Sequence, residues 1–365
     1  MSATAIILAA GEGTRMKSAL PKVAHRILGV PMVSHVVDAA RTAGIIRVVV
    51  VTGHGAEAVE ALLSDAGVGF ARQEQRLGTG HAVMCALEST GALEGPVVVL
   101  AGDVPLIRPE TLRSLVDAQV SSGAACVVLS AIFPDPTGYG RIVRDEAGAV
   151  QAIVEHRDLA PGQEAIAEGN VGIYCFDGAA LSAHLHRLEA SNAQSEYYLT
   201  DLVALFVAEG LRVEAVVADD VDESHGVNSR VQLAEVGRLL QRRINERHML
   251  AGVTMTDPAL VWVGPHVTVG RDTVLEPMTF LLGESCVGSD CRIGPDARVT
   301  DSCVGDGCVI DASVVAGSSL GDGATVGPLA CVTGARIEAG SVVGTGAVTC
   351  EGESDPRYGD PVGDE

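Results

Sequence analysis

A glycine-rich loop with basic residues close behind it is the first segment that could do chemistry. Gly11-Glu12-Gly13-Thr14-Arg15-Met16 follows an apolar run at Ala3–Ala10, and Pro21-Lys22 comes shortly after. Glycines let a backbone approach a ligand, and successive N–H groups can cradle phosphate oxygens. The loop lacks the GKS or GKT of a Walker A motif, and Met16 stands at the third glycine of a dinucleotide GxGxxG. The alternative is an ordinary turn with solvated basic residues.

The charge around this loop favours the first interpretation. Residues 1–30 carry four basic residues and one acidic residue, a local charge of 4 − 1 = +3, in a chain whose net charge is −22. The chain has only two lysines, Lys17 and Lys22, and both lie beside the loop. A positive segment in an acidic protein indicates an anionic ligand, and we expect Lys22 in an exposed loop.

Further polar residues follow other apolar runs. Asp103 comes directly after the strand-like run Val97–Leu100, where a carboxylate could hold Mg²⁺ together with substrate phosphates. The alternative is an Asp that caps a turn before Pro105. Other polar residues and glycines stand between the apolar runs, and each of them alone would indicate only a turn or a helix cap. These are Gln73, Gly78-Thr79, Gly140, Glu155, Asn170 and Asn228.

The order of apolar runs predicts the elements that must position these side chains. Strand-like runs alternate with helical ones, which indicates an α/β domain with a mostly parallel sheet. Ligands of such sheets bind beyond the carboxyl ends of the strands. The predicted strands are Ala3–Ala10, Arg47–Thr52, Val97–Leu100, Cys126–Ala131, Val150–Glu155 and Val171–Phe176. The predicted helices are Pro31–Ala43, Ala56–Ser64, Thr79–Ser89, Pro109–Ser121, Glu196–Glu209 and Ser229–Leu250.

Taken together, these motifs resemble the sugar-nucleotide pyrophosphorylase superfamily. The sequence is most similar to the uridyltransferase half of the bacterial bifunctional GlcNAc-1-phosphate uridyltransferase/glucosamine-1-phosphate acetyltransferase family, over about residues 3–250. The motifs that carry the resemblance occur in family order: LAAGEGTRM with PK, LGTGHA, GDVPLI, GYGRI, IVEH, NVGIY and GVNSR.

The resemblance implies a role for each matching residue. Arg15 and Lys22 would contact the phosphates as catalytic residues, and Asp103 and Asn228 would ligate Mg²⁺. The residues implied for the uracil nucleotide are Leu8, Ala9, Ala10, Gly11, Gln73, Gly78 and Thr79, and those implied for the N-acetylamino sugar are Gly140, Glu155 and Asn170.

The implied reaction suits these residue types. A sugar 1-phosphate oxygen would attack the α-phosphorus of UTP, and pyrophosphate would leave. A phosphate monoester is largely dianionic at neutral pH, since its second pKa is about 6. The nucleophile therefore needs cations and in-line positioning, not a general base.

A six-residue period appears in the second part of the chain. The aliphatic residues that recur are Val263, Val269, Leu275, Leu281, Val287, Ile293 and Val299, then Val304, Ile310, Leu320, Val326, Val332, Ile337 and Val343. Four residues after many of them stands a small or β-branched residue, Val314 among them. This repeat predicts a parallel β-helix of about four to five coils. The resemblance implies that it is left-handed and forms trimers.

The chain has nine cysteines, and some of them could form a zinc site. Cys286 and Cys303 are 17 residues apart, as are Cys291 and Cys308, so each pair is expected in adjacent coils. Cys291 and Cys308 fall at the inward small-residue position. Buried thiols are therefore favoured over one zinc site, and the odd count argues against a secreted disulfide framework.

The bifunctional relatives carry an acetyltransferase site with lysines and an arginine. This chain has no lysine after Lys22, and Val332-Thr333-Gly334 stands where the relatives have an Arg-Pro-Gly-like step. We therefore expect no acetyltransferase activity.

The chain is expected to divide into a nucleotidyltransferase domain at 1–228, a linking helix at 229–250, a left-handed β-helix at 251–350 and an acidic, disordered tail at 351–365.

Composition excludes several classes of protein. An acidic chain with a pI near 4.7 lacks the basic surface of a nucleic-acid binder. No apolar run approaches the roughly 18 residues of a membrane span, and the N-terminus lacks the features of a secretory signal, so we expect a cytoplasmic protein.

The expected partners are UTP, a sugar 1-phosphate and two further copies of the chain. The alternatives are another sugar or cyclitol 1-phosphate, another nucleotide, a non-catalytic assembly subunit, and a hexapeptide acyltransferase.

Overall fold

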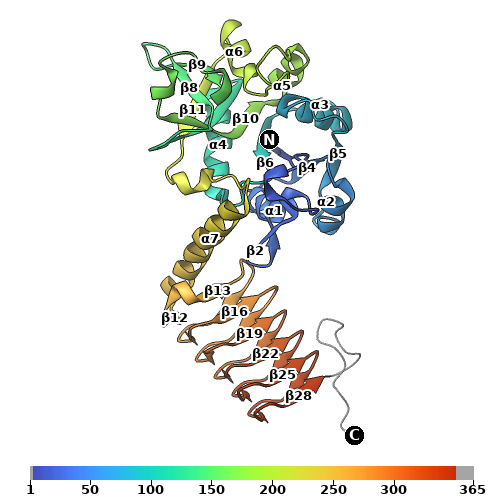
Figure 1. The fold of residues 1–365 in the computed structure, drawn as a ribbon, viewed down its shortest axis with the longest axis vertical. Helices are drawn as coiled ribbons and strands as arrows, with labels where there is room; N and C mark the ends of the chain where they lie inside the picture. The colour runs from blue at the N-terminus through green and yellow to red at the C-terminus, as the bar shows by residue number, and fades with distance from the viewer. Residues whose placement is uncertain (1–2, 351–365) are drawn as a thin grey trace. The chain divides into compact units, whose positions relative to one another are not determined.

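A computed structural model describes residues 3–350, which fall into two compact units (Figure 1). Within the described residues, the first unit comprises residues 3–26 and Pro31–Val236, and the second comprises Ile27–Val30 and residues 237–350. The division falls inside helix α7, Arg230–Leu250. The expected tail at 351–365 lies outside the described residues.

The first unit is built on one mixed, mostly parallel sheet, as the sequence predicts. Its strands run in the order β11-β7-β10-β6-β1-β4-β5, and β10 alone in this order is antiparallel to its neighbours β6 and β7. Strands β8 and β9 form an antiparallel hairpin attached to β10. The strands are β1 (Thr4–Leu8), β4 (Arg47–Thr52), β5 (Gly69–Arg72), β6 (Pro96–Ala101), β7 (Cys126–Ile132), β8 (Arg141–Arg144), β9 (Val150–Val154), β10 (Glu168–Asp177) and β11 (Val213–Val217).

Helices cover both faces of this sheet because its central strands are apolar on both sides. In β1, Ala5 and Ile7 belong to the core shared with α1 and α4, while Ile6 belongs to the core shared with α3, α5 and α6. Two buried faces explain why these strands read as continuous apolar runs. The helices are α1 (Met32–Thr42), α2 (Ala56–Leu62), α3 (Thr79–Thr90), α4 (Pro109–Ser122), α5 (Gly178–His184) and α6 (Asp201–Ala208).

One predicted helix is shorter than expected. The apolar pattern predicts a helix over Glu196–Glu209, but α6 begins only at Asp201. The preceding residues bond to the start of α3 and the loop before it: Tyr197 N donates to Leu77 O at 2.7 Å, and Leu199 N donates to Thr79 Oγ1 at 3.1 Å. Long-range hydrogen bonds therefore replace the first helical turns.

The second unit contains the predicted left-handed β-helix, drawn in orange to red in Figure 1. Short strands stack into three parallel sheets, the first being β12, β15, β18, β21, β24 and β27. These lie at Thr254–Met255, Val274–Leu275, Arg292–Ile293, Val309–Ile310, Thr325–Val326 and Val342–Val343. The second sheet has β13 (Val261–Val263), β16 (Thr279–Leu282), β19 (Arg298–Thr300), β22 (Val314–Ala316), β25 (Cys331–Thr333) and β28 (Val348–Cys350). The third has β14 (Thr268–Val269), β17 (Cys286–Val287), β20 (Cys303–Val304), β23 (Ser319–Leu320) and β26 (Arg336–Ile337).

The side chains of these coils follow the six-residue period. Leu281, Val299 and Val332 are fully buried inside the stack. Val314 is an exception, because the shortened turn before it places Ser313 at the inward position instead. The Oγ atom of Ser313 donates to Gly327 O at 2.5 Å, which satisfies this buried hydroxyl.

The cysteines lie where the repeat predicts. Cys286 and Cys303 are paired in register on adjacent strands, and Cys291 and Cys308 are buried. The Sγ atoms of Cys291 and Cys308 lie 3.1 and 3.2 Å from the carbonyl oxygens of Gly305 and Gly321. Burial raises the pKa of both thiols. These two cysteines therefore act as small core residues of the coil.

No helix between residues 3 and 350 is both long enough and apolar enough to cross a bilayer.

Candidate functional site

A cavity of about 520 Å³ lies at the carboxyl ends of β1 and β6, two neighbouring parallel strands. This is where an α/β sheet places its ligands. Among the residues that line it are nine named from the sequence: Leu8, Ala9, Ala10, Gly11, Lys22, Gln73, Gly78, Thr79 and Asp103. The structure thus brings the residues suggested for the nucleotide together with one suggested for phosphate and one for the metal.

Two glycines of the loops around this cavity have no room for a side chain. Gly13 has φ +64°, and a Cβ there would lie 2.5 Å from the Cβ of Lys22. Gly78 has φ +107°, and its Cβ would lie 2.6 Å from Tyr197 O. Glycine is required at both positions, because the left-handed backbone and the close contact each exclude L side chains.

Lys22, Asp103 and Asn228 meet at one point, although they come from three distant segments. Lys22 begins the 3-10 helix η2 (Lys22–Ala24), Asp103 follows β6, and Asn228 precedes α7. The Nζ atom of Lys22 forms an ion pair with Asp103 Oδ2 and donates to Asn228 Oδ1 at 3.1 Å. The expectation of an exposed lysine is wrong: the Lys22 side chain is only 14 % exposed, because this carboxylate and this amide enclose its end.

This arrangement fits a divalent cation. The carboxylate and amide oxygens of Asp103 and Asn228 already converge on a positive charge, the Lys22 ammonium. Oxygen ligands of this kind suit Mg²⁺, which needs one or two protein ligands when phosphates and water supply the rest. These two residues would therefore hold the metal, as the sequence suggests.

Gln73 lines the cavity, and hydrogen bonds fix the orientation of its side-chain amide. Gln73 is 4 % exposed, and its Nε2 lies 3.0 Å from Gly78 O and 3.0 Å from His81 Nδ1. The carbonyl of Gly78 can only accept, so the nitrogen of the amide must face it. Within residues 3–350, Oε1 of Gln73 receives no hydrogen bond, so this acceptor remains available to a ligand.

The residues suggested for the sugar form a second group. Asn170 N donates to Gly140 O at 2.8 Å, and a Cβ on Gly140 would lie 3.5 Å from Glu155 Oε2. Glu155 Oε1 accepts from Thr200 Oγ1 at 3.2 Å, and Asn170 Nδ2 donates to Tyr174 OH at 2.7 Å.

Burial raises the pKa of Glu155. The Thr200 hydroxyl opposes this increase, and nearby Asp201 and Asp158 raise the pKa further. Gly140, Glu155 and Asn170 thus lie together, but they are not among the residues that line the cavity above.

Arg15 is placed differently from the other candidates. It lies in the 3-10 helix η1 (Thr14–Met16), is exposed, and is not among the cavity's lining residues. Its phosphate contact remains a prediction.

The sequence analysis missed several residues that line the cavity, among them Arg76, Glu196 and Ala82. Arg76 forms an ion pair with Glu12 of the glycine-rich loop. Its position three residues after Gln73 is the signal in the sequence that could have identified it. No local pattern indicates Glu196, whose backbone N donates to Asn192 Oδ1 at 3.2 Å and whose neighbour Tyr197 makes the long-range bond to Leu77.

Comparison with known proteins gives consistent similarities. Residues 5–166 match the MobA-like NTP transferase domain. The chain is 49% identical over 325 residues to the bifunctional protein GlmU of Caldanaerobacter subterraneus subsp. tengcongensis, which covers 89% of this chain and 70% of that protein. It is 48% identical over 327 residues to the GlmU of Heliobacterium modesticaldum, covering 90% and 71%. The GlmU of Trichlorobacter lovleyi is 47% identical over 328 residues, covering 89% and 71%.

Proposed function

The chain belongs to the family of bifunctional GlmU proteins and is a sugar-1-phosphate nucleotidyltransferase, and from that premise we propose that it transfers UMP from UTP to N-acetylglucosamine 1-phosphate. The products are UDP-GlcNAc and pyrophosphate. The observation that carries the proposal is the meeting of Lys22, Asp103 and Asn228 beside the cavity that Gln73 and the glycine-rich loop line.

The base-binding end of the cavity favours uracil over cytosine. The free Oε1 of Gln73 is an acceptor, and uracil presents a ring N–H donor where cytosine presents an acceptor nitrogen. The backbone of Leu8–Gly11 and of Gly78-Thr79 would hold the rest of the nucleoside. If cytosine were bound, its acceptor nitrogen would face the acceptor oxygen of Gln73. One buried polar atom would then lack a hydrogen bond, which costs about 1–3 kcal/mol.

The reaction needs positive charge and alignment. Lys22 would neutralise the phosphates of UTP as the sugar phosphate oxygen attacks the α-phosphorus. Arg76, which lines the cavity, and Arg15 of the glycine-rich loop would add to this positive charge. Mg²⁺ held by Asp103 and Asn228 would supply further charge neutralisation on the phosphate oxygens when it is bound. Gly140, Glu155 and Asn170 would orient the N-acetylamino sugar.

We also propose that this chain does not transfer acetyl groups. Residues 23–365 contain no lysine, and the segment Val332-Thr333-Gly334 contains no basic residue. Within the β-helix Val332 is fully buried, so its side chain packs in the core rather than facing a ligand.

Assembly into a trimer through the β-helix is a further proposal. The coils carry apolar side chains that a partner copy would cover: Leu329 is 77 % exposed, and the half-buried rings of Trp262 and Phe280 stack with 6.2 Å between their centroids. Exposed apolar groups of this kind commonly mark an interface between proteins.

The proposed substrates are tested by an array of nucleoside triphosphates against sugar and cyclitol 1-phosphates, with Mg²⁺ present and pyrophosphate release as the readout. UTP with GlcNAc 1-phosphate should give the highest kcat/KM. A higher value for another pair would replace the proposed substrates, and no release from any pair would favour a non-catalytic subunit.

A further inference from the structure

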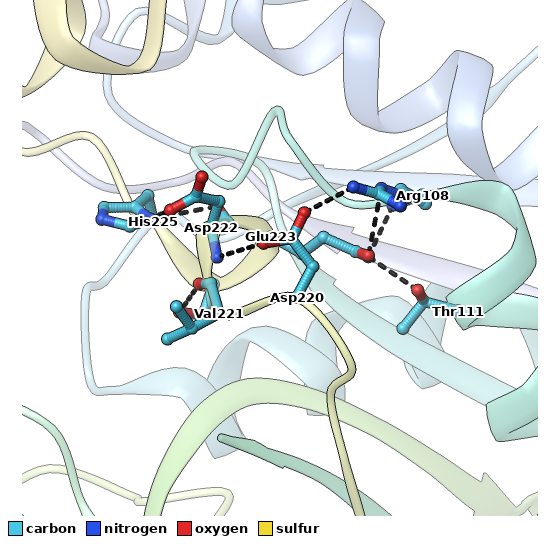
Figure 2. Close-up of polar contacts among 8 residues, drawn as sticks. Arg108, Thr111, Asp220, Val221, Asp222, Glu223 and His225 are labelled. Atoms are coloured by element: carbon cyan, nitrogen blue, oxygen red, sulfur yellow. Dashed lines mark hydrogen bonds and ion pairs between the residues drawn. The ribbon is translucent and has the colours of Figure 1, made fainter. Parts of the chain in front are cut away.

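Glu223 is a buried carboxylate that joins two segments of the first unit. It lies in the 3-10 helix η6 (Val221–Ser224) and is 2 % exposed. Its Oε2 accepts from the backbone N of Arg108 at 3.0 Å and from Thr111 Oγ1 at 2.7 Å (Figure 2). Glu223 therefore caps the N-terminus of α4 from a distant part of the chain, where Arg108 offers no side-chain cap of its own.

The side chain of Arg108 closes the same junction from the other side. Its Nε lies 3.3 Å from Glu223 Oε1, and its Nη2 pairs with Asp220 (Figure 2). Asp220 Oδ1 in turn accepts from Asp222 N at 3.0 Å, which fixes the turn that carries Glu223. Hydrogen bonds and ion pairs thus hold both the backbone and the side chain of this turn against the start of α4.

The two segments joined here are the ones that carry the proposed metal ligands. Arg108 lies 108 − 103 = 5 residues after Asp103, and Glu223 lies 228 − 223 = 5 residues before Asn228. Nearer the ligands, Val227 N donates to Asp103 O at 2.9 Å. The segments 103–108 and 223–228 are therefore fastened at both ends, once beside the ligands and once at Glu223.

We propose that Glu223 is a positioning residue that fixes Asn228 against Asp103, so that their oxygens are preorganised for a divalent cation. This inference rests on the proposed metal-binding role of Asp103 and Asn228. Without Glu223, one of the two fastenings is lost, and the Asn228 oxygen must be ordered at the moment the cation binds. Partners that orient metal ligands commonly contribute 10–100-fold to metal affinity.

The test is Mn²⁺ binding to the free protein, measured by water-proton relaxation in the absence of nucleotide. Glu223→Ala should raise the Mn²⁺ dissociation constant at least about tenfold. Glu223→Gln keeps an oxygen that can accept from Arg108 N and should recover most of the affinity. In turnover, Glu223→Ala should require more Mg²⁺ for half-maximal rate and approach the wild-type kcat at saturating Mg²⁺.

Glu110→Ala is the matched control, because Glu110 is an exposed glutamate in the first turn of the same helix. It should leave Mn²⁺ affinity unchanged. If Glu223→Ala does not fold, Arg108→Gln tests the same junction from a half-exposed side chain and should weaken Mn²⁺ binding several-fold.

Two outcomes separate the possible failures. A wild-type protein that transfers nucleotide and binds Mn²⁺, with folded Glu223→Ala and Arg108→Gln variants of the same affinity, overturns the positioning role alone. A wild-type protein that neither binds Mn²⁺ nor transfers nucleotide overturns the proposed function, and the positioning role with it.

Discussion

Lys22 and Asn228 are 206 residues apart in the sequence, yet the Nζ atom of Lys22 donates to Asn228 Oδ1 at 3.1 Å. The same ammonium pairs with Asp103. The Lys22 ammonium thus lies between the two side chains proposed to hold Mg²⁺. A cation held by Asp103 and Asn228 would repel this ammonium, so we expect Lys22 and the metal to compete for these two oxygens.

Lys22→Ala should lower kcat/KM for UTP by about 10²–10³-fold or more, because it removes a cation that stabilises charge in the transition state. The variant should remain folded, with a modest loss in Tm from the unpaired Asp103. Lys17→Gln is the matched control, since Lys17 is the other lysine of the same loop and is exposed. Equal turnover of wild type and Lys22→Ala would contradict the assigned role.

The same variant should bind Mn²⁺ more tightly than wild type when no nucleotide is present. Removal of the ammonium leaves Asp103 and Asn228 free for the cation, so the dissociation constant should fall while activity is lost. Water-proton relaxation or calorimetry measures this directly. An unchanged or weaker Mn²⁺ affinity in Lys22→Ala would mean that the lysine does not compete for the metal site.

Asp103→Asn and Asn228→Ala should each raise the Mg²⁺ concentration needed for half-maximal rate and lower kcat. A Mg²⁺ site with few protein ligands depends strongly on each of them. The measurement is a Mg²⁺ titration of the initial rate at fixed UTP. Full activity of the wild type in excess EDTA would exclude a metal requirement altogether.

Glu155→Gln should stabilise the protein at neutral pH and weaken binding of the sugar phosphate. Burial raises the pKa of Glu155 in the folded state above its unfolded value near 4.5. The folded state therefore holds the proton more tightly, and stability falls as the pH rises from about 4.5 through the folded pKa. Glutamine carries no charge and escapes this penalty.

Urea unfolding at several pH values from 5 to 8 checks whether the stability of the folded protein falls as the pH rises. The stability advantage of Glu155→Gln over wild type should grow with pH and then level off, while the KM for the sugar phosphate rises about tenfold or more. An advantage that shrinks with rising pH would show that the folded protein favours the ionised carboxyl.

Acetyl transfer from acetyl-coenzyme A to glucosamine 1-phosphate should be undetectable with this chain. The reason is the lack of basic residues at Val332-Thr333-Gly334 and of any lysine after Lys22. Thiol release from acetyl-coenzyme A in the presence of the sugar phosphate is the measurement. Release above background from pure protein would refute the proposed loss of activity.

The full-length chain should sediment as a trimer of about 112 kDa, three times its mass of 37.5 kDa. Deletion of residues 251–365 should give a monomer, because it removes the exposed apolar surface of the coils. Sedimentation of the full-length protein at 37.5 kDa at micromolar concentration would contradict assembly through the β-helix.

The local pattern of apolar residues in the sequence was enough to predict much of the fold. The strand Arg47–Thr52 is found as predicted, because both of its faces are buried and its apolar run is unbroken. Most of the aliphatic hexapeptide residues are buried, because every coil repeats the same inward positions, while Val269 and Ile337 are half-buried. In contrast, β9 was predicted as a strand but its hairpin partner β8 was not, nor was the antiparallel direction of β10, since an apolar run does not reveal which neighbour it pairs with.

The candidate site was predictable in its residues but not in its geometry. Motifs around Lys22, Asp103 and Asn228 identified these residues, yet no periodicity could place an ammonium between the two oxygens. Glu223 was not identified, because an acidic residue in a polar segment has no local pattern that distinguishes a buried helix cap from a solvated side chain. Such contacts arise only when distant segments pack.

Phosphorus NMR of one reaction tests the central claim most directly. The sample contains the pure chain, Mg²⁺, UTP and N-acetylglucosamine 1-phosphate. We predict that the α-phosphate of UTP and the sugar phosphate are converted into the diphosphate of UDP-GlcNAc, with one pyrophosphate formed per product, and that Lys22→Ala converts them at least about 100-fold more slowly. An unchanged spectrum with the folded wild-type protein, or inorganic phosphate in place of pyrophosphate, would contradict uridyl transfer at this site.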